Sequence, residues 1–166
     1  KNLNYFVIIP IHDESADSFI DPFLVLGRKN LIEWTLDESV SVCGQENTLV
    51  LTNNEKARKF INGAYPSVKI FKRSDIMVEG DAFSVKKIII SHIDMMLGYE
   101  ARQENELNSA VFINYLSTPF RQEKHMRHAI DLMEIYSLDR VVSADPVSND
   151  LHICDAGVLT TTSGHG

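Results

Sequence analysis

NYFVIIP, residues Asn4–Pro10, carries the strongest fold signal of the chain, because aromatic and β-branched residues follow one another and a proline closes the run. An apolar run of this length without polar alternation is typical of a strand buried on both faces of a parallel sheet. Similar runs recur along the chain, and each predicts a further strand. They are NTLVLT at Asn47–Thr52, VKIFK at Val68–Lys72, SAVFINY at Ser109–Tyr115 and RVVSA at Arg140–Ala144.

Helical patterns separate these runs. Apolar residues recur at three- and four-residue spacing in several segments, which predicts amphipathic helices. These segments are Asn30–Val42, Asn54–Ile61, Asp81–Gly98 and Gln122–Tyr136. Asn53 or Asn54 is placed to cap the second of them. Strands that alternate with helices need crossover connections, so we predict an α/β fold, a three-layer αβα sandwich around a mainly parallel sheet.

The remaining segments predict loops and a turn. Residues 11–26 are polar with scattered apolar side chains, which predicts a long loop. Near the end, a turn at Asp155–Gly157 separates two short extended runs within His152–Thr162. Ligands of parallel α/β sheets bind beyond the carboxyl ends of the strands, so the functional site is expected in the loops there. Those loops follow Pro10, Thr52, Lys72 and Tyr115.

Composition bounds the class of protein. A chain of 166 residues with 44% hydrophobic and 23% charged residues suits one soluble domain with a filled core. The net charge of −7 argues against nucleic-acid binding. No apolar run approaches the roughly 18 residues of a membrane span, so no membrane partner is expected. Cys43 and Cys154 lack metal-binding spacing, and we interpret them as free thiols of a cytoplasmic protein.

Two stretches carry a resemblance to a known family. IPIHDESADSFIDPFLVLGRKNLI at Ile9–Ile32 is similar to the pattern IPARGGSKGIPxKNIxxLxGKPLI, and FINYLSTPFR at Phe112–Arg121 is similar to VLLQPTSPLR. Shorter matches occur in the same order at FKR (Phe71–Arg73), GDAFSV (Gly80–Val85) and RVVSADPV (Arg140–Val147). Together they cover most of the chain. The sequence resembles the CMP-sugar cytidylyltransferases, the acylneuraminate or CMP-sialic acid synthetase-like proteins.

The resemblance implies a Rossmann-like fold of the nucleotide-diphospho-sugar transferase type and the transfer of CMP from CTP to an acidic sugar, with Mg²⁺ as cofactor. It implies a single cytidylyltransferase-like domain over residues 1–166, without the family's C-terminal part for sugar binding and dimerisation. The nucleotide would then be contacted by residues after the first, third and fourth strands. They are His12, Ser15, Arg73, Tyr115, Ser117, Thr118 and Arg121. Tyr115 stands where the family has a glutamine.

The loop after the first strand departs from the family pattern. His12 stands at the family's arginine, Asp13 and Glu14 at its two glycines, and Ala16 at its lysine. No lysine or arginine occurs between Lys1 and Arg28, and the loop holds the carboxylates Asp13, Glu14, Asp17 and Asp21. At an effective dielectric constant near 20, one like-charge pair about 4 Å apart costs roughly 4 kcal/mol. A CTP triphosphate placed there would be repelled.

Three interpretations follow from this loop. In the first, the domain is a degenerate, non-catalytic relative that serves as an interaction or scaffolding module, within a longer chain or a homo-oligomer. In the second, it is a divergent nucleotidyltransferase whose Asp13, Glu14 and Asp17 bind Mg²⁺, which carries the phosphates. In the third, the acids form a solvated surface loop. Ser117 or Thr118 could also serve only to cap the next helix. Arg73 could likewise form only a surface ion pair.

Overall fold

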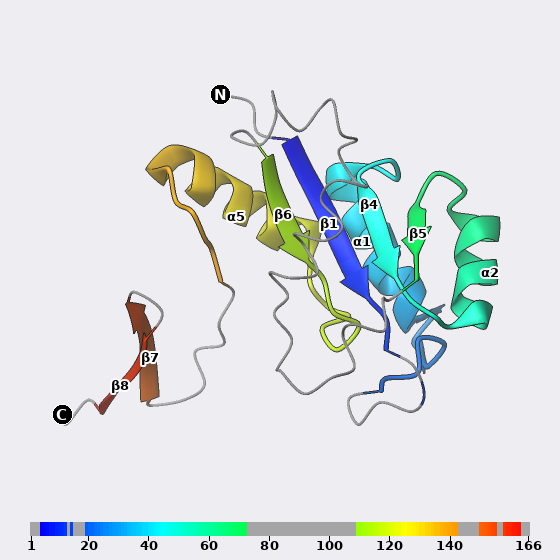
Figure 1. The fold of residues 1–166 in the computed structure, drawn as a ribbon, viewed down its shortest axis with the longest axis horizontal. Helices are drawn as coiled ribbons and strands as arrows, with labels where there is room; N and C mark the ends of the chain where they lie inside the picture. The colour runs from blue at the N-terminus through cyan, green and yellow to red at the C-terminus, as the bar shows by residue number, and fades with distance from the viewer. Residues whose placement is uncertain are drawn as a thin grey trace.

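A parallel sheet forms the centre of the molecule (Figure 1). The computed structural model describes residues 4–12, 14, 19–72, 109–142, 150–155 and 158–163. Within them the sheet is four-stranded, with the order β5-β4-β1-β6, and every neighbouring pair is parallel. The strands are β1 at Asn4–Pro10, β4 at Thr48–Leu51, β5 at Lys69–Phe71 and β6 at Ser109–Ile113. The predicted α/β fold with a parallel sheet is therefore confirmed.

β1 is an inner strand of the sheet. Val7 pairs with Thr48 of β4 on one side and with Phe112 of β6 on the other. Its last five residues are all buried. Because both edges of the strand are hydrogen-bonded and both faces are covered, no position along it favours a polar side chain. This is the physical reason for the unbroken apolar run in the sequence.

Three helices lie among the described residues, and their caps explain where two of them begin. They are α1 at Leu31–Cys43, α2 at Glu55–Ala64 and α5 at Glu123–Tyr136. The backbone N–H of Glu33 donates to Oδ1 of Asn30 at 2.9 Å, and that of Ala57 donates to Oδ1 of Asn54 at 3.0 Å. The predicted cap on the second helix is confirmed at Asn54. No helix in this part of the chain combines the length and hydropathy that a membrane crossing requires.

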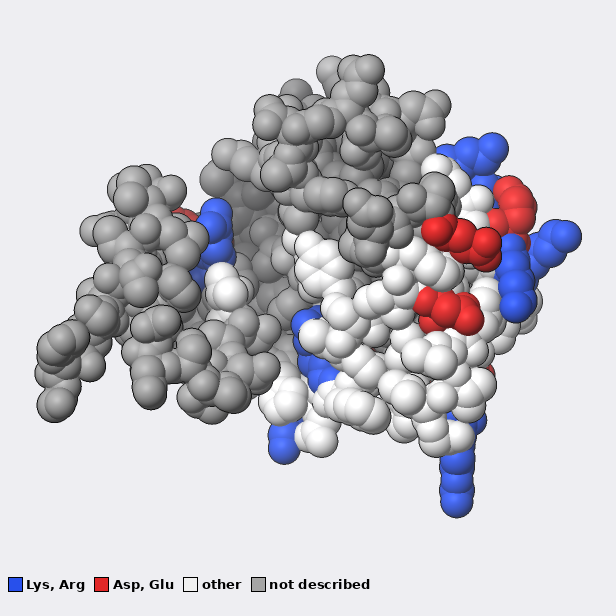
Figure 2. Space-filling view, turned by 90° about the horizontal axis from the view of Figure 1, so that it is seen from below, with Lys and Arg blue, Asp and Glu red and all other residues white. Residues whose placement is uncertain are grey.

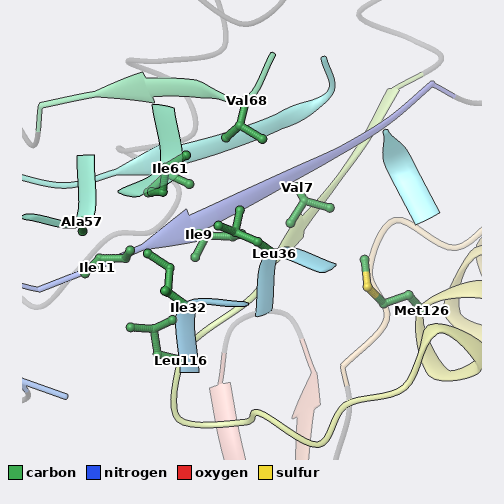
Figure 3. Close-up of a cluster of buried hydrophobic side chains, with 11 residues drawn as sticks. Val7, Ile9, Ile11, Ile32, Leu36, Ala57, Ile61, Val68, Leu116 and Met126 are labelled. Carbon is green, nitrogen blue, oxygen red and sulfur yellow. The ribbon is translucent and has the colours of Figure 1, made fainter. Parts of the chain in front are cut away.

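The side chains of β1 alternate between two buried clusters, as those of a strand do. Val7 and Ile9 face the described helices, where Leu36 of α1 and Ile61 of α2 are buried against them (Figure 3). Met126 of α5 belongs to the same cluster. On the other face of the sheet, a second buried cluster consists of Phe6, Ile8, Leu49 and Leu51. The sheet therefore has buried apolar side chains on both faces, as the middle layer of a sandwich does. The helix predicted at Asp81–Gly98 lies outside the described residues.

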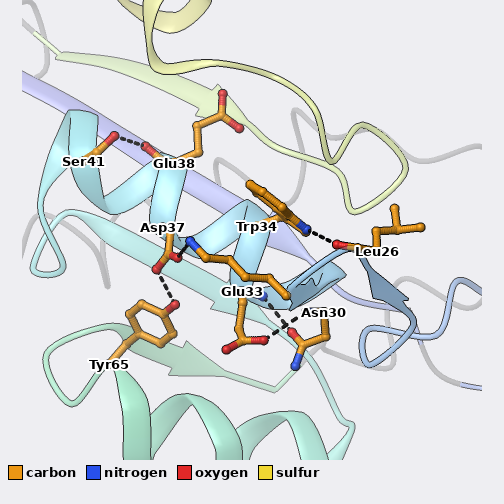
Figure 4. Close-up of polar contacts among 9 residues, drawn as sticks. Leu26, Asn30, Glu33, Trp34, Asp37, Glu38, Ser41 and Tyr65 are labelled. Carbon is orange, nitrogen blue, oxygen red and sulfur yellow. Dashed lines mark hydrogen bonds and ion pairs between the residues drawn. The ribbon is translucent and has the colours of Figure 1, made fainter.

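A short hairpin precedes α1. β2 (Val25–Leu26) pairs antiparallel with β3 (Lys29–Asn30), and Gly27 in the turn has a φ of +67°, which favours glycine. The indole N–H of Trp34 on α1 donates to the backbone oxygen of Leu26 at 2.9 Å (Figure 4). The long loop predicted before α1 is therefore wrong at its last two residues. The bond from Trp34 to Leu26 holds the first strand of the hairpin against α1, and no local sequence pattern indicates it.

Asp37 on α1 joins the hairpin to the end of α2. Its Oδ2 pairs with Nζ of Lys29 at 2.6 Å, and its Oδ1 accepts a hydrogen bond from the hydroxyl of Tyr65 at 2.5 Å (Figure 4). Burial, followed by this bond to Asp37, raises the pKa of Tyr65. Because Lys29 and Asp37 are partly exposed, their pairing orients the hairpin more than it stabilises the fold.

The strand predicted at Arg140–Ala144 is wrong where the structure describes it. Residues 140–142 form no strand, and Val142 is 75% exposed. α5 ends at Tyr136, and Ser137 then adopts a left-handed conformation with a φ of 52° that turns the chain off the helix axis. The two valines have the composition of a strand, but β-branched residues form one only where a neighbouring strand pairs with them. The remainder of that run lies outside the described residues.

The last two strands form a hairpin. β7 (Asp150–Asp155) and β8 (Val158–Ser163) pair antiparallel, with Asp155 opposite Val158. The two extended runs predicted within His152–Thr162 are confirmed.

Candidate functional site

A hollow opens where β1 and β6 end. Its volume is about 470 Å³, within the range of small-molecule sites. From β1 the chain builds β4 and β5 on one side and β6 on the other, so the hollow lies at the point where the strand order reverses. Ligands of open α/β sheets bind at such a point. The lining residues are Pro10, His12, Phe19, Ile20, Tyr115, Leu116 and Ser117.

The β1 side of the hollow continues from the buried strand. The backbone N–H of Ile11 donates to the oxygen of Leu51 at 2.9 Å, which extends the sheet beyond the end of β1. Ile11 itself is fully buried, so the next residue, His12, emerges half-buried at the hollow. Phe19 and Ile20 line the same side and are also half-buried. The sequence pattern singled out His12 as a nucleotide contact, whereas it pointed to Phe19 only as a side chain that could fill the space and did not point to Ile20.

The β6 side of the hollow comes from the segment after the strand. The backbone N–H of Asn114 donates to the oxygen of Ile8 at 3.0 Å, so this segment leaves the sheet in register with β1. Tyr115 is 39% exposed and Ser117 is exposed, whereas Leu116 between them is buried in the core. The structure thus brings Tyr115 and Ser117, both expected from the sequence, to the same hollow as His12.

Thr118 and Arg121 lie in the same loop but do not line the hollow, and their side chains bond to other residues of the loop. The hydroxyl of Thr118 donates to the backbone oxygen of Tyr115 at 3.2 Å, and Nη2 of Arg121 donates to Oγ1 of Thr118 at 3.1 Å. The N-cap of α5 is Gln122, so the alternative that Ser117 or Thr118 caps this helix is wrong.

Asn114 is the residue of this loop that the sequence pattern missed. It is buried, and its side chain accepts a hydrogen bond from Nη1 of Arg121 and donates from Nδ2 to Oγ of Ser39 at 2.8 Å. Its one signal in the sequence is an amide at the end of an otherwise apolar run. Burial of such a group requires partners, and Arg121 and Ser39 supply them.

Glu38 on α1 is a second group that the sequence did not indicate. Burial raises the pKa of its carboxyl group from 4.5 to about 7, although the positive charge of Arg121 acts in the opposite direction. In the part of the chain that the structure describes, its Oε1 is buried with no hydrogen-bond partner. Figure 4 shows that its side chain points to a different side of α1 from that of Asp37.

Few charges surround the described part of the site. Figure 2 looks onto the end of the molecule toward which β1 points, and uncharged side chains form most of the described surface there. Glu14 is exposed, and Asp13, Ser15, Asp17 and Arg73 lie outside the described residues. Among the described residues, no group of three or more His, Cys, Asp or Glu side chains could hold a metal ion. The arrangement suits a flat, ring-bearing ligand that meets aromatic side chains, a hydroxyl and an imidazole.

Comparisons with known proteins agree with this architecture. No family model and no curated protein sequence matches the chain. A solved 4-diphosphocytidyl-2C-methyl-D-erythritol synthase is similar over 97% of this chain and 69% of its own, with a TM-score of 0.59 and 14% identity. A cytidylyltransferase from Leptospira borgpetersenii serovar Hardjo-bovis is similar over 84% of this chain, with a TM-score of 0.55 and 15% identity. The chain spans about half the length of the latter, 52%. At these identities the likeness concerns the fold alone, and the chain has the α/β fold of these two proteins.

Proposed function

We propose that this chain is a nucleotide-binding domain of the cytidylyltransferase type, and that the hollow between β1 and β6 holds the cytidine part of CTP. The observation that carries the proposal is the position of the hollow at the point where the strand order reverses, with lining residues from both strand ends. The fold likeness to two cytidylyltransferases supports CTP as the nucleotide.

The lining suits a pyrimidine nucleoside. Tyr115 and Phe19 offer aromatic faces, and stacking of a base on an aromatic ring contributes about 1–3 kcal/mol. Ser117 and His12 supply hydrogen-bonding groups for the edge of the base or for the ribose.

The finer function that we propose is the transfer of CMP from CTP to an acidic sugar. A sugar hydroxyl oxygen would bond to the α-phosphorus while the bond to pyrophosphate breaks and the hydroxyl proton passes to a base. The likeness of Ile9–Ile32 and Phe112–Arg121 to the CMP-sugar cytidylyltransferases supports this choice. Mg²⁺ is the cofactor proposed for it, because the acidic loop repels a triphosphate unless a cation intervenes. The described residues do not by themselves form a site for that ion.

A second candidate is a non-catalytic interaction or scaffolding module on the same fold. The content of the β1 loop favours it, because phosphoryl transfer needs positive charge around the phosphates and no lysine or arginine lies between Lys1 and Arg28. Both candidates keep a pocket at the ends of the strands. They differ in whether pyrophosphate is released.

Thermal unfolding with and without CTP tests nucleotide binding. At 100 times the Kd, CTP with Mg²⁺ should stabilise the protein by about 2.7 kcal/mol. For a domain of this size that raises Tm by about 5–10 °C. Tyr115→Ala should lose most of the shift because it removes the stacking face. Tyr136→Ala makes the same change on a 66% exposed residue at the end of α5 and should keep it. No shift at millimolar CTP in the unaltered protein would sink the proposal.

Pyrophosphate release separates the transferase from the interaction module. The protein is mixed with CTP, Mg²⁺ and a series of acidic sugars, and pyrophosphate is measured. Release that depends on one sugar supports CMP transfer. Binding of CTP without release from any sugar supports the module.

A further inference from the structure

A buried amide lies beneath the loop that lines the hollow. Asn114 is only 2% exposed, and its Nδ2 donates to Oγ of Ser39 at 2.8 Å. The hydroxyl of Ser39 donates in turn to the backbone oxygen of Thr35 at 2.7 Å. A buried amide that lost these partners would be left unsatisfied and would destabilise the fold, so the contacts hold the start of the loop against α1.

Arg121 closes the loop from its other end. Its Nη1 donates to Oδ1 of Asn114, and its Nη2 donates to Oγ1 of Thr118 at 3.1 Å. Thr118 is itself bonded to the backbone oxygen of Tyr115 at 3.2 Å. The two terminal nitrogens of Arg121 are therefore engaged by groups of its own loop, in the planar geometry that a guanidinium provides.

We infer that Arg121 is a positioning residue of the proposed nucleotide site: with Asn114 it clamps the segment Tyr115–Thr118 against the hollow, and it does not hold the triphosphate. The inference rests on the proposed function. Leu116 anchors the segment in the core, and the clamp holds its neighbours Tyr115 and Ser117 at the hollow. A loop that is held in its binding conformation spares the ligand the cost of ordering it.

A direct contact between Arg121 and phosphate makes different predictions. Such a contact favours CTP but not cytidine, because cytidine has no phosphate. A clamp favours both ligands equally, because it acts through Tyr115 and Ser117. Lysine separates the two roles as well: it keeps the charge for a phosphate but cannot make the two planar contacts.

Dissociation constants for cytidine and for CTP with Mg²⁺, measured by calorimetry, decide between the roles. Arg121→Gln and Arg121→Lys should each raise the dissociation constants of both ligands about tenfold, because each variant loses hydrogen bonds to a charged group. Thr118→Val removes one partner of the clamp on the surface, where folding is not at risk, and should weaken both ligands less. The matched control is Arg127→Gln on α5, where the exposed Arg127 pairs with Glu123 at 2.6 Å. It should change neither constant.

Fluorescence of Trp34, the only tryptophan of the sequence, can report a change in the position of the loop without any ligand. The ring of Trp34 lies 6.5 Å from the ring of Phe120, which lies in the same loop between the clamp residues Thr118 and Arg121. Release of the loop should shift Trp34 emission in Arg121→Gln protein. The same shift is expected in Asn114→Leu protein. Leucine is the residue at this position in the pattern VLLQPTSPLR. Arg127→Gln should leave the emission unchanged.

Three outcomes overturn the inference. If Arg121→Gln lowers the affinity for CTP but not for cytidine, or if Arg121→Lys restores the affinity for CTP, Arg121 contacts the phosphate. Unchanged emission and unchanged constants in folded Arg121→Gln protein remove the clamp. These two outcomes leave the proposed function intact. Unaltered protein that binds neither cytidine nor CTP overturns the proposed function and the inference together.

Discussion

At the scale of single residues, Glu38 carries the clearest electrostatic consequence. Its pKa is raised by burial from 4.5 to about 7, so the folded state holds the proton more tightly than the unfolded state. The resulting stability is fully present below about pH 4.5 and is lost as the pH rises through about 7. Arg121 lies near enough to lessen the cost of the charged form, but burial outweighs it.

Glu38→Gln should therefore raise Tm at pH 8 and leave it nearly unchanged at pH 4.5. Glutamine matches the protonated side chain in shape and has no charge to bury. Allowing for solvent screening of a half-buried group, we expect a gain on the order of 1 kcal/mol, or about 2–4 °C. The measurement is thermal unfolding followed by circular dichroism at both pH values.

Glu123→Gln is the matched control for this prediction. Glu123 is exposed, and its hydrogen bond to Arg127 lowers its pKa, so its small contribution is present at high pH and is lost as the pH falls. The control should give no gain at pH 8. Equal gains for Glu38→Gln at both pH values would contradict the assigned pKa.

At the scale of elements, the α2 helix depends on one cap. Asn54→Ala removes the acceptor for the backbone N–H of Ala57 and should lower stability by about 1 kcal/mol, which lowers Tm by about 2–4 °C. Asn62→Ala makes the same change at an exposed position inside α2, where alanine favours the helix. It should leave Tm equal or slightly higher. A similar loss in both variants would show that the cap is not the cause.

The elements also differ in how far local sequence predicts them. α2 was predicted because its cap and its apolar spacing lie within one short segment. The β2–β3 hairpin was not, because it depends on Trp34 of the following helix. Residues 140–142 show the reverse case: a strand-like composition without a pairing partner among the described residues gives no strand.

At the scale of the whole molecule, stability depends on the face of the sheet that the described helices cover. Leu36 is fully buried there between α1 and β1. Leu36→Ala should lower the free energy of unfolding by about 2–5 kcal/mol, from lost apolar burial and the cavity left behind. Ile135→Ala is the control, because Ile135 is 71% exposed and should cost less than about 0.5 kcal/mol. Unfolding in urea measures both, and similar losses would contradict this core.

Local sequence was enough to predict the parallel sheet, most of its strands and the three described helices, because burial on two faces leaves an unbroken apolar run and a cap leaves an asparagine at a fixed place. It also pointed to His12, Tyr115 and Ser117, which the structure places around one hollow. The groups that surround these three residues follow from long-range packing. Asn114 meets Ser39, 75 residues away, and burial of Glu38 depends on packing around α1. Contacts between residues so far apart leave no periodic signal, so the loop clamp and the carboxyl group with its raised pKa follow from packing alone.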